Sequence, residues 1–161
     1  MKVRDIMTRD ALSCRKDSDV ATAGRLMLEG RCGMLPVLDE HGIVAGVITD
    51  RDIALAAATR QRNASHIAVH EVMSEGVRSC LAGDELRTAL RQMEEARVRR
   101  LPVLDATRHL AGVLSIDDIV LRAVGHEDGV SAAELVEALR RIWSQPAVEP
   151  EMNFSETFTS G

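Results

Sequence analysis

Apolar residues recur along the chain with two spacings, one typical of helices and the other of buried strands. The first helical stripe consists of apolar or small residues that are close to one another on a helix, namely Val20, Ala23, Gly24, Met27 and Leu28. Polar residues 17–19 precede this stripe and suit a helix start. The apolar runs 35–38 and 43–48 predict two buried strands, and polar residues 39–42 between them predict a hairpin turn. Residues 50–59 predict a second helix.

The whole pattern occurs a second time, 66 residues further along the chain. The segment VRDIMT at 3–8 returns as VHEVMS at 69–74, LPVLD at 35–39 returns at 101–105, and AGVITDRDI at 45–53 returns as AGVLSIDDI at 111–119. The helical stripe returns as Leu86, Ala89, Leu90 and Met93 behind Asp84. An ungapped alignment of residues 3–60 with 69–126 has 22 identities in 58 positions. The chain therefore contains a tandem duplication.

Each copy is expected to form a mixed α+β unit with a three-stranded sheet and two helices. Such a unit leaves an apolar surface exposed, and burying it against the other copy gives a pair related by a pseudo-twofold axis. The predicted boundaries are residues 1–66 for the first repeat and 67–126 for the second. An S-x-x-E capping box then predicts an amphipathic helix within residues 127–145. Residues 146–161 are rich in Pro, Glu, Ser and Thr and are predicted to be a disordered tail.

The net charge of −5 is unevenly distributed along the chain. Residues 1–66 carry 10 basic and 9 acidic groups, residues 67–126 carry 8 and 9, and residues 127–161 carry 2 and 7. A nearly neutral body has no broad basic face for holding a nucleic-acid backbone. Aromatic residues make up 2% of the chain and all lie in its last twenty residues. We therefore expect no aromatic stacking in the main body.

The cysteines and the apolar runs indicate a cytoplasmic protein. Cys14, Cys32 and Cys80 form no CxxC motif, and their odd number fits reduced thiols better than a disulfide framework. Cys14 and Cys80 occupy equivalent positions of the two repeats and are expected to be small hydrophobic residues of buried strands. No Cys/His spacing indicates a metal site. The first ten residues have no apolar stretch of signal-peptide length, and no apolar run approaches the ~20 residues that span a bilayer.

Each copy has a glycine, a hydroxyl residue and an aspartate that follow one another at intervals of three residues. They lie around the junction between a predicted strand and the helix that follows it. They are Gly46, Thr49 and Asp52 in the first copy and Gly112, Ser115 and Asp118 in the second. A strand that ends at a helix start exposes backbone N–H groups to a phosphate, and the hydroxyl can add a hydrogen bond. The aspartate can accept hydrogen bonds from both hydroxyls of a ribose, and glycine permits close backbone approach. The alternative is that each aspartate only favours the helix N-terminus.

The repeated segments DIMT, LPVLD and GVITDRDI resemble those of the CBS (cystathionine β-synthase) domain pair over about residues 1–126. The chain is similar to stand-alone bacterial members of that family. The resemblance implies a flat homodimer of pseudo-twofold discs, called Bateman modules, with clefts between repeats that bind adenine nucleotides in many members. It also implies that backbone groups of the segments beginning at Thr8 and Ser74 line the base pocket. Because no aromatic residue lies nearby in the sequence, aliphatic side chains are expected to enclose the base.

The copies differ immediately before LPVLD, where the first has Gly33 and Met34 and the second has Arg99 and Arg100. In nucleotide-binding members of the family this position is commonly basic and contacts phosphate. The resemblance therefore implies that Arg99 and Arg100 are phosphate ligands. The resemblance also implies that these arginines share a cleft with the ribose-binding aspartate of the other repeat. That aspartate is Asp52, so the cleft of Asp52 is favoured. The alternative is that both arginines lie at a solvated strand end.

These observations favour a regulatory module that senses AMP, ADP, ATP or an S-adenosyl ligand and acts in trans on an unidentified protein. No GxSxG, GxxxxGK or GxGxxG motif indicates an enzyme, so no catalytic residue or catalytic cofactor is expected. Two alternatives remain open. One is a ligand-free dimerisation scaffold, and the other is an RNA- or DNA-binding module that uses Arg91, Arg97, Arg99 and Arg100. A homodimer is expected because the apolar helix stripes cannot all face the two small sheets.

Overall fold

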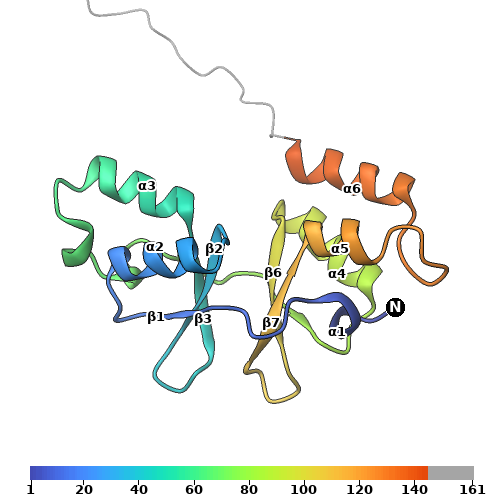
Figure 1. Ribbon diagram of the computed structural model, residues 1–161, viewed down its shortest axis with the longest axis horizontal. Coiled ribbons are helices and arrows are strands. Elements are labelled where there is room, and N and C mark those ends of the chain that lie inside the picture. Colours follow the sequence, from blue (N-terminus) through green and yellow to red (C-terminus); the bar gives the residue numbers. More distant parts are fainter. Residues whose placement is uncertain (145–161) are drawn as a thin grey trace, which may run out of the picture.

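The order strand, helix, strand, strand, helix occurs twice along the chain (Figure 1). The computed structural model describes residues 1–144. The first series consists of α1 (Val3–Ile6), β1 (Cys14–Arg15), α2 (Val20–Glu29), β2 (Met34–Leu38), β3 (Val44–Thr49) and α3 (Asp50–Thr59). After two short 3-10 turns, Ala64–His66 and Val69–Glu71, the second series consists of β4 (Ser74–Glu75), β5 (Cys80–Leu81), α4 (Leu86–Ala96), β6 (Arg100–Leu104), β7 (Leu110–Ser115) and α5 (Ile116–Arg122). The chain then forms α6 (Ala132–Trp143), and residues 146–161, predicted to be a disordered tail, lie outside the described residues.

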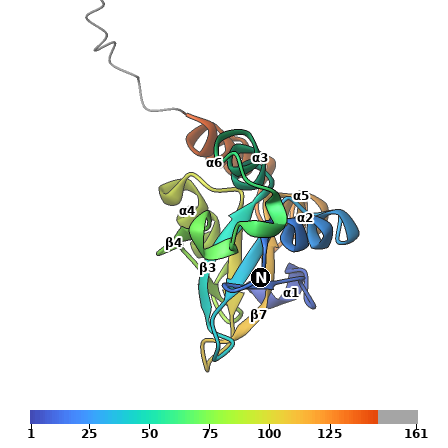
Figure 2. The ribbon, with the colours of Figure 1, turned by 90° about the vertical axis from the view of Figure 1, so that its left-hand side faces the viewer.

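The strands form two small sheets, which confirms the predicted mixed α+β fold. In the first sheet β1 lies parallel to β2, and β2 forms an antiparallel hairpin with β3. The second sheet repeats this arrangement with β5, β6 and β7. The first sheet gains a fourth short strand because β4, from the start of the second repeat, pairs with β3. Both hairpins point to the same end of the molecule, where Ile43 of one pairs with His109 of the other (Figures 1 and 2).

Capping and burial explain where the long helices begin and which face they bury. The Asp19 carboxylate accepts a hydrogen bond from the Thr22 backbone N–H at 2.8 Å and caps α2. The core-facing side chains are Val20, Ala23 and Met27 in α2, and Leu86, Ala89, Leu90 and Met93 in α4. These spacings define one helix face. Leu28, which its spacing assigned to the same stripe, is instead 79% exposed. None of the helices within residues 1–144 is long and apolar enough to cross a membrane.

Each repeat completes its hydrophobic core with opening residues of the other repeat. Val3 and Ile6 are buried among residues of the second repeat, whereas Ile67 and Val69 are buried among residues of the first. We call this arrangement the segment exchange. Backbone hydrogen bonds hold it in both directions, from the Val3 N–H to the Asp84 carbonyl at 3.0 Å and from the Val69 N–H to the Ser18 carbonyl at 2.8 Å. The packed units therefore differ from the repeats counted along the sequence.

Two glycines allow the exchanged segments to cross the strands at close range. A side-chain carbon added at Gly112 would lie 2.4 Å from the carbonyl oxygen of Thr8, and one added at Gly46 would lie 2.4 Å from that of Ser74. Thr8 also exchanges two backbone hydrogen bonds with Val113, at 2.9 and 3.0 Å. Only glycine leaves room for this approach. The repeated glycine therefore has a structural reason that is independent of any ligand.

Cys14 and Cys80 are buried at equivalent positions of the two sheets, opposite Val37 and Val103. Burial raises the pKa of the Cys14 thiol to about 11 and that of the Cys80 thiol to about 12. Both thiols therefore stay protonated at neutral pH and act as small hydrophobic residues, as predicted. Among residues 1–144 no three His, Cys, Asp or Glu side chains are grouped so that they could hold a metal ion.

The helix α6 packs on α4 at the end of the molecule opposite the hairpins (Figures 1 and 2). It begins with a capping box in which the Glu134 N–H donates to the Ser131 hydroxyl and the Ser131 N–H donates to the Glu134 carboxylate. Ion pairs with α4 join Arg87 to Glu134 and Arg141 to Glu94, each at 2.9 Å. The Arg87 hydrogen bond, followed by those from Ser131, lowers the pKa of Glu134 to about 2. The side chains of α6 that join the core of the second repeat are Leu135, Ala138 and Ile142.

Replacing Gly112 with alanine is expected to destabilise the protein by about 1 to 3 kcal/mol, because the new methyl group collides with backbone and not with a movable side chain. Urea unfolding measures the effect. Gly83→Ala is the matched control, since a side-chain carbon there meets nothing within 4 Å. Equal free energies of unfolding for the two variants would contradict the close crossing at Thr8.

Candidate functional site

A cavity of about 770 Å³ lies between the two repeats, next to the repeated motif. We call it the first cleft. The first repeat contributes residues at the junction of β3 and α3, including Thr49. The second contributes Gly76, Val77 and the segment from the end of α4 into β6, which includes Arg99 and Arg100. The structure thus brings into one cavity the hydroxyl residue of the first repeat and the arginine pair of the second.

Five arginines line the first cleft, namely Arg51, Arg78, Arg97, Arg99 and Arg100. Among the described residues of this lining, Asp50 is the only acidic one, so the formal charge of the lining is plus four. The five arginines form no ion pair with any other residue of the range 1–144. By contrast, Arg87 and Arg141 are paired between α4 and α6. A chain with a net charge of −5 therefore concentrates unpaired positive charge in one cavity.

The second cleft is a smaller cavity, of about 390 Å³, lined by the equivalent motif of the second repeat. Ser115 and Asp118 line it together with Thr8. Its charged residues are two arginines and three aspartates, namely Arg31, Arg100, Asp10, Asp117 and Asp118. Arg100 lies between the two cavities and lines both. The two clefts share an architecture but differ in the sign of their charge, because the second has a formal charge of minus one.

Thr49 and Asp52 form a capping box at the start of α3. The Asp52 Oδ2 atom accepts hydrogen bonds from the Thr49 N–H at 2.8 Å and from the Thr49 hydroxyl at 2.7 Å. In return, the Asp52 N–H donates to the Thr49 hydroxyl at 3.3 Å. The other carboxylate oxygen, Oδ1, accepts no hydrogen bond within residues 1–144. One oxygen therefore holds the helix start while the other stays available.

Asp118 forms the same box with Ser115, but both of its carboxylate oxygens have partners. Its Oδ2 atom accepts from the Ser115 N–H at 2.8 Å and from the Ser115 hydroxyl at 2.6 Å. Its Oδ1 atom lies 3.2 Å from the Thr8 hydroxyl and 3.3 Å from the Arg122 guanidinium. The residue is only 7% exposed. Asp118 is therefore part of an internal network that joins α5 to the exchanged first segment, and Asp52 has no equivalent of Arg122 because Ala56 stands there.

Four of the residues that the sequence predicts for the site line neither cleft, namely Gly46, Gly112, Asp52 and Ser74. The two glycines are covered by the exchanged segments, whose carbonyl groups pass over them. Ser74 is exposed in β4, and the next residues of the same segment, Gly76 and Val77, line the first cleft instead. Asp52 is half-buried in the first turn of α3 and is hydrogen-bonded to the lining residue Thr49.

The expectation that no aromatic side chain lies near the clefts is wrong. Trp143, in the last position of α6, lines the first cleft together with Ile142. Because α6 packs along α4, its end reaches the cleft beside Arg97 and Val98. Distance along the sequence concealed this arrangement. The sequence signal for it was the apolar stripe of α6, because a helix with such a stripe buries it against another part of the protein.

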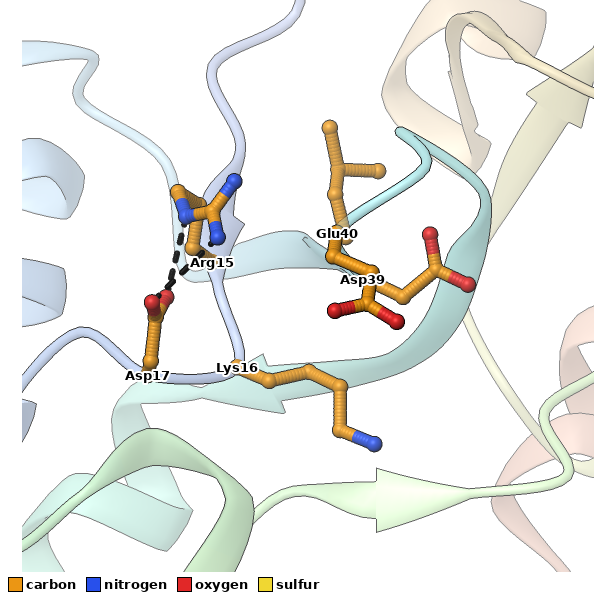
Figure 3. Close-up of a pocket in the computed structure, with 6 residues that line it drawn as sticks. Arg15, Lys16, Asp17, Asp39 and Glu40 are labelled. Atoms are coloured by element: carbon orange, nitrogen blue, oxygen red, sulfur yellow. Dashed lines mark hydrogen bonds and ion pairs between the residues drawn. The ribbon is translucent and has the colours of Figure 1, made fainter.

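A third cavity, of about 360 Å³, lies outside both clefts, beside the turn of the first hairpin (Figure 3). Arg15 and Asp17 in its lining form an ion pair at 2.9 Å. The Asp39 carboxylate accepts hydrogen bonds from the N–H groups of His41 and Ile43, each at 2.9 Å. These bonds, that from Ile43 first, lower the pKa of Asp39. Both carboxylates are therefore used to hold the turns around this cavity, which gives it a structural explanation.

The two repeats define the class of protein. The family model described as the CBS domain matches residues 3–59 and 69–125, so the chain belongs to the CBS domain family and carries two tandem copies. It is 32% identical over 130 residues to the CBS domain-containing protein YhcV of Bacillus subtilis, across 81% of this chain and 91% of YhcV. Some of the curated relatives are longer proteins. The chain is 31% identical over 124 residues to homoserine O-acetyltransferase of Methanocorpusculum labreanum, which is 77% of this chain but 24% of that protein.

Solved structures of CBS domain pairs have the same fold. The structure of CBSX2 from Arabidopsis thaliana in complex with AMP has a TM-score of 0.63 and 26% sequence identity, over 74% of this chain and 93% of that one. The CBS domain pair of protein MJ0100, in complex with 5′-methylthioadenosine and S-adenosyl-L-methionine, has a TM-score of 0.68 and 24% identity, over 75% of this chain and 94% of that one. The resemblance noted in the repeated segments is thereby confirmed.

The two aspartates are expected to differ in their contribution to stability. Asp118→Ala should lower the free energy of unfolding by roughly 1.5 to 3 kcal/mol, because it removes the helix cap together with the bonds of a buried carboxylate to Thr8 and Arg122. Asp52→Ala should cost about 1 kcal/mol, the usual value of a helix cap. Chemical denaturation of both variants compares them directly. Equal losses would show that the internal network around Asp118 adds nothing beyond the cap.

Proposed function

We propose that this protein is a regulatory module that senses an adenine nucleotide bound in the first cleft and acts on another protein. The observation that carries the proposal is the group of five arginines in the lining of this cleft, none of them ion-paired within residues 1–144. Arginine binds phosphate through two parallel charge-assisted hydrogen bonds, so unpaired arginines around a cavity favour a phosphorylated ligand. The complex of CBSX2 with AMP supports an adenine nucleotide.

The charge of the first cleft favours a nucleotide with several phosphates. A nucleoside triphosphate carries roughly four negative charges at neutral pH, since the terminal phosphate has a second pKa near 6. That charge complements five arginines opposed by one aspartate. The positive sulfonium of an S-adenosyl ligand would be repelled by the same arginines. The expected order of affinity is therefore ATP, ADP, AMP and lastly an S-adenosyl compound.

We assign different parts of the nucleotide to different residues of the first cleft. Arg99 and Arg100 bind phosphate. The free Oδ1 atom of Asp52 accepts from the ribose hydroxyls once the ligand fills the cleft, while Oδ2 keeps its bonds to Thr49 and the helix cap is retained. The backbone groups of Gly76 and Val77, which end the segment 74–77 predicted for the base pocket, contact the base.

The second cleft is proposed to be structural. Its lining has more aspartates than arginines, and a phosphate group would meet repulsion there. The carboxylate of Asp118, which would have to accept from a ribose, is already bound to Thr8 and Arg122. Filling this cleft with the same nucleotide would require breaking that network. We therefore expect a single nucleotide for each chain.

The two alternatives differ from this proposal in measurable ways. An RNA- or DNA-binding surface would need its arginines on one continuous face, yet Arg91 lines a separate cavity with Glu85 and Asp128, while Arg97, Arg99 and Arg100 line the first cleft. In a ligand-free scaffold, the five unpaired arginines of the first cleft would repel one another, and no bound phosphate would offset that repulsion. Calorimetry with nucleotides separates the scaffold from the sensor.

Calorimetry of the full chain is expected to show one bound nucleotide, with ATP the tightest of ATP, ADP and AMP. Arg99→Ala and Arg100→Ala should each weaken ATP binding roughly ten- to a hundredfold, the effect of losing a charge-assisted hydrogen bond, and should leave adenosine binding almost unchanged. Asp52→Ala should weaken ATP and adenosine alike, because its proposed partner is the ribose. Binding should also weaken as salt concentration rises.

Arg91→Ala is the matched control for these variants, since Arg91 is an exposed arginine of α4 that does not line the first cleft. It should bind ATP as the wild type does. Failure of the wild type to bind any of the three nucleotides would reject the proposed function. Equal ATP affinity in the wild type, Arg99→Ala and Arg100→Ala would reject the assignment of the phosphate ligands.

We also propose that two copies form a homodimer through the outer faces of α3 and α5. Leu55 and Leu121, which are equivalent under the 66-residue repeat, are 52% and 79% exposed. Apolar groups at equivalent places on two helices suit a twofold interface.

Light scattering is expected to give twice the 17.6 kDa of one chain. Leu121→Glu should shift the mass toward a single chain, whereas Arg108→Glu on the hairpin should not. A wild-type mass of one chain at micromolar concentration would refute the dimer.

A further inference from the structure

Trp143 lies at the boundary between the C-terminal helix and the first cleft. The residue is 60% exposed, although tryptophan is large and mostly apolar. It follows Ile142, which is buried in the core of the second repeat, and both residues line the first cleft. Within residues 1–144 it is the one aromatic residue, and it is the only tryptophan of the chain. An open aromatic ring therefore stands at the cavity that also holds the unpaired arginines.

The position of this ring is fixed by the packing of α6. Leu135, Ala138 and Ile142 join the core of the second repeat along the length of the helix. The ion pair between Arg141 and Glu94 ties the end of α6 to α4 only two residues before Trp143. Apolar burial supplies most of the stabilisation here, because exposed ion pairs contribute little. The helix therefore holds Trp143 at the cleft instead of leaving it on a mobile end.

We propose that Trp143 stacks on the base of the nucleotide bound in the first cleft, so that α6, which lies outside both repeats, forms part of the ligand site. The inference rests on the proposed function and adds a residue that contacts the base. Aromatic rings stack on nucleobases through their π faces, and such a contact buries ring surface that is otherwise open to water. The neighbouring arginines hold the phosphates, so the ring and the charges recognise opposite ends of one molecule.

Stacking also gives ligand binding a mechanical consequence. Because α6 carries the ring, the end of this helix contacts the ligand directly, and the chain continues after Trp143 for a further 18 residues, 144–161. Occupancy of the cleft therefore adds a contact that holds the end of α6 in place. If Trp143 had only a packing role, its replacement would lower the stability of the protein. It would then weaken the binding of ATP and of inorganic tripolyphosphate to the same extent.

The test uses the full chain with two probes, ATP and inorganic tripolyphosphate, and combines calorimetry with tryptophan fluorescence. Trp143 is the only tryptophan and the chain has no tyrosine, so the emission reports on this ring alone. ATP is expected to quench the emission. Trp143→Ala should bind ATP roughly ten- to a hundredfold more weakly, the range that base stacking supplies, and should bind tripolyphosphate as the wild type does. Trp143→Phe should restore most of the ATP affinity.

Val136→Ala is the matched control, because Val136 lies on α6, is 50% exposed and does not line the first cleft. Melting curves of every variant verify that the fold is retained. Equal ATP affinity in the wild type and Trp143→Ala would overturn the stacking contact and leave the proposed function intact. Equal weakening of ATP and tripolyphosphate would also overturn it, since it would indicate a structural role. Failure of the wild type to bind either probe would reject the nucleotide site itself.

Discussion

The exchange of opening segments between the repeats is the contact on which the rest of the structure depends. Val3 and Ile6 enter the second core while Ile67 and Val69 enter the first, so neither repeat can bury its apolar residues without the other. The same crossing carries the segments that follow into the space between the repeats, where they form a wall of each cleft. Stability and cleft geometry therefore have a common source. A substitution that loosens the crossing is expected to disturb both.

Two equivalent aspartates differ in what surrounds their second carboxylate oxygen. Each holds its helix start with one carboxylate oxygen. Arg122 follows Asp118 by four residues and pairs with the second oxygen, whereas Ala56 occupies that place after Asp52 and leaves the oxygen free. Helix capping and ligand binding are thus compatible explanations for the same side chain, because a carboxylate has two oxygens. The difference agrees with the distribution of charge, which is positive in the first cleft and slightly negative in the second.

Much of the fold could be predicted because the 66-residue repeat gives the order of the elements and the apolar spacing gives their buried faces. The segment exchange could not, since Val3 and Val69 are the same residue in similar surroundings and nothing local indicates which core each enters. Arg99 and Arg100 drew attention because the two copies differ there, and both line the first cleft, while their role as phosphate ligands stays a prediction. Trp143 was missed because its place depends on how α6 packs against α4, a long-range contact that no local pattern records.

The exchange also bears on how such a molecule could evolve. An ancestral chain with a single copy would have to trade its opening segment with a second molecule, and symmetry would make the two clefts of that pair identical. Joining two copies in one chain removes this restriction, because each position is then encoded twice and can change separately. One cleft was free to collect arginines while the other closed around an internal ion pair. Gene duplication thus allows a symmetric pair of clefts to become two clefts of opposite charge.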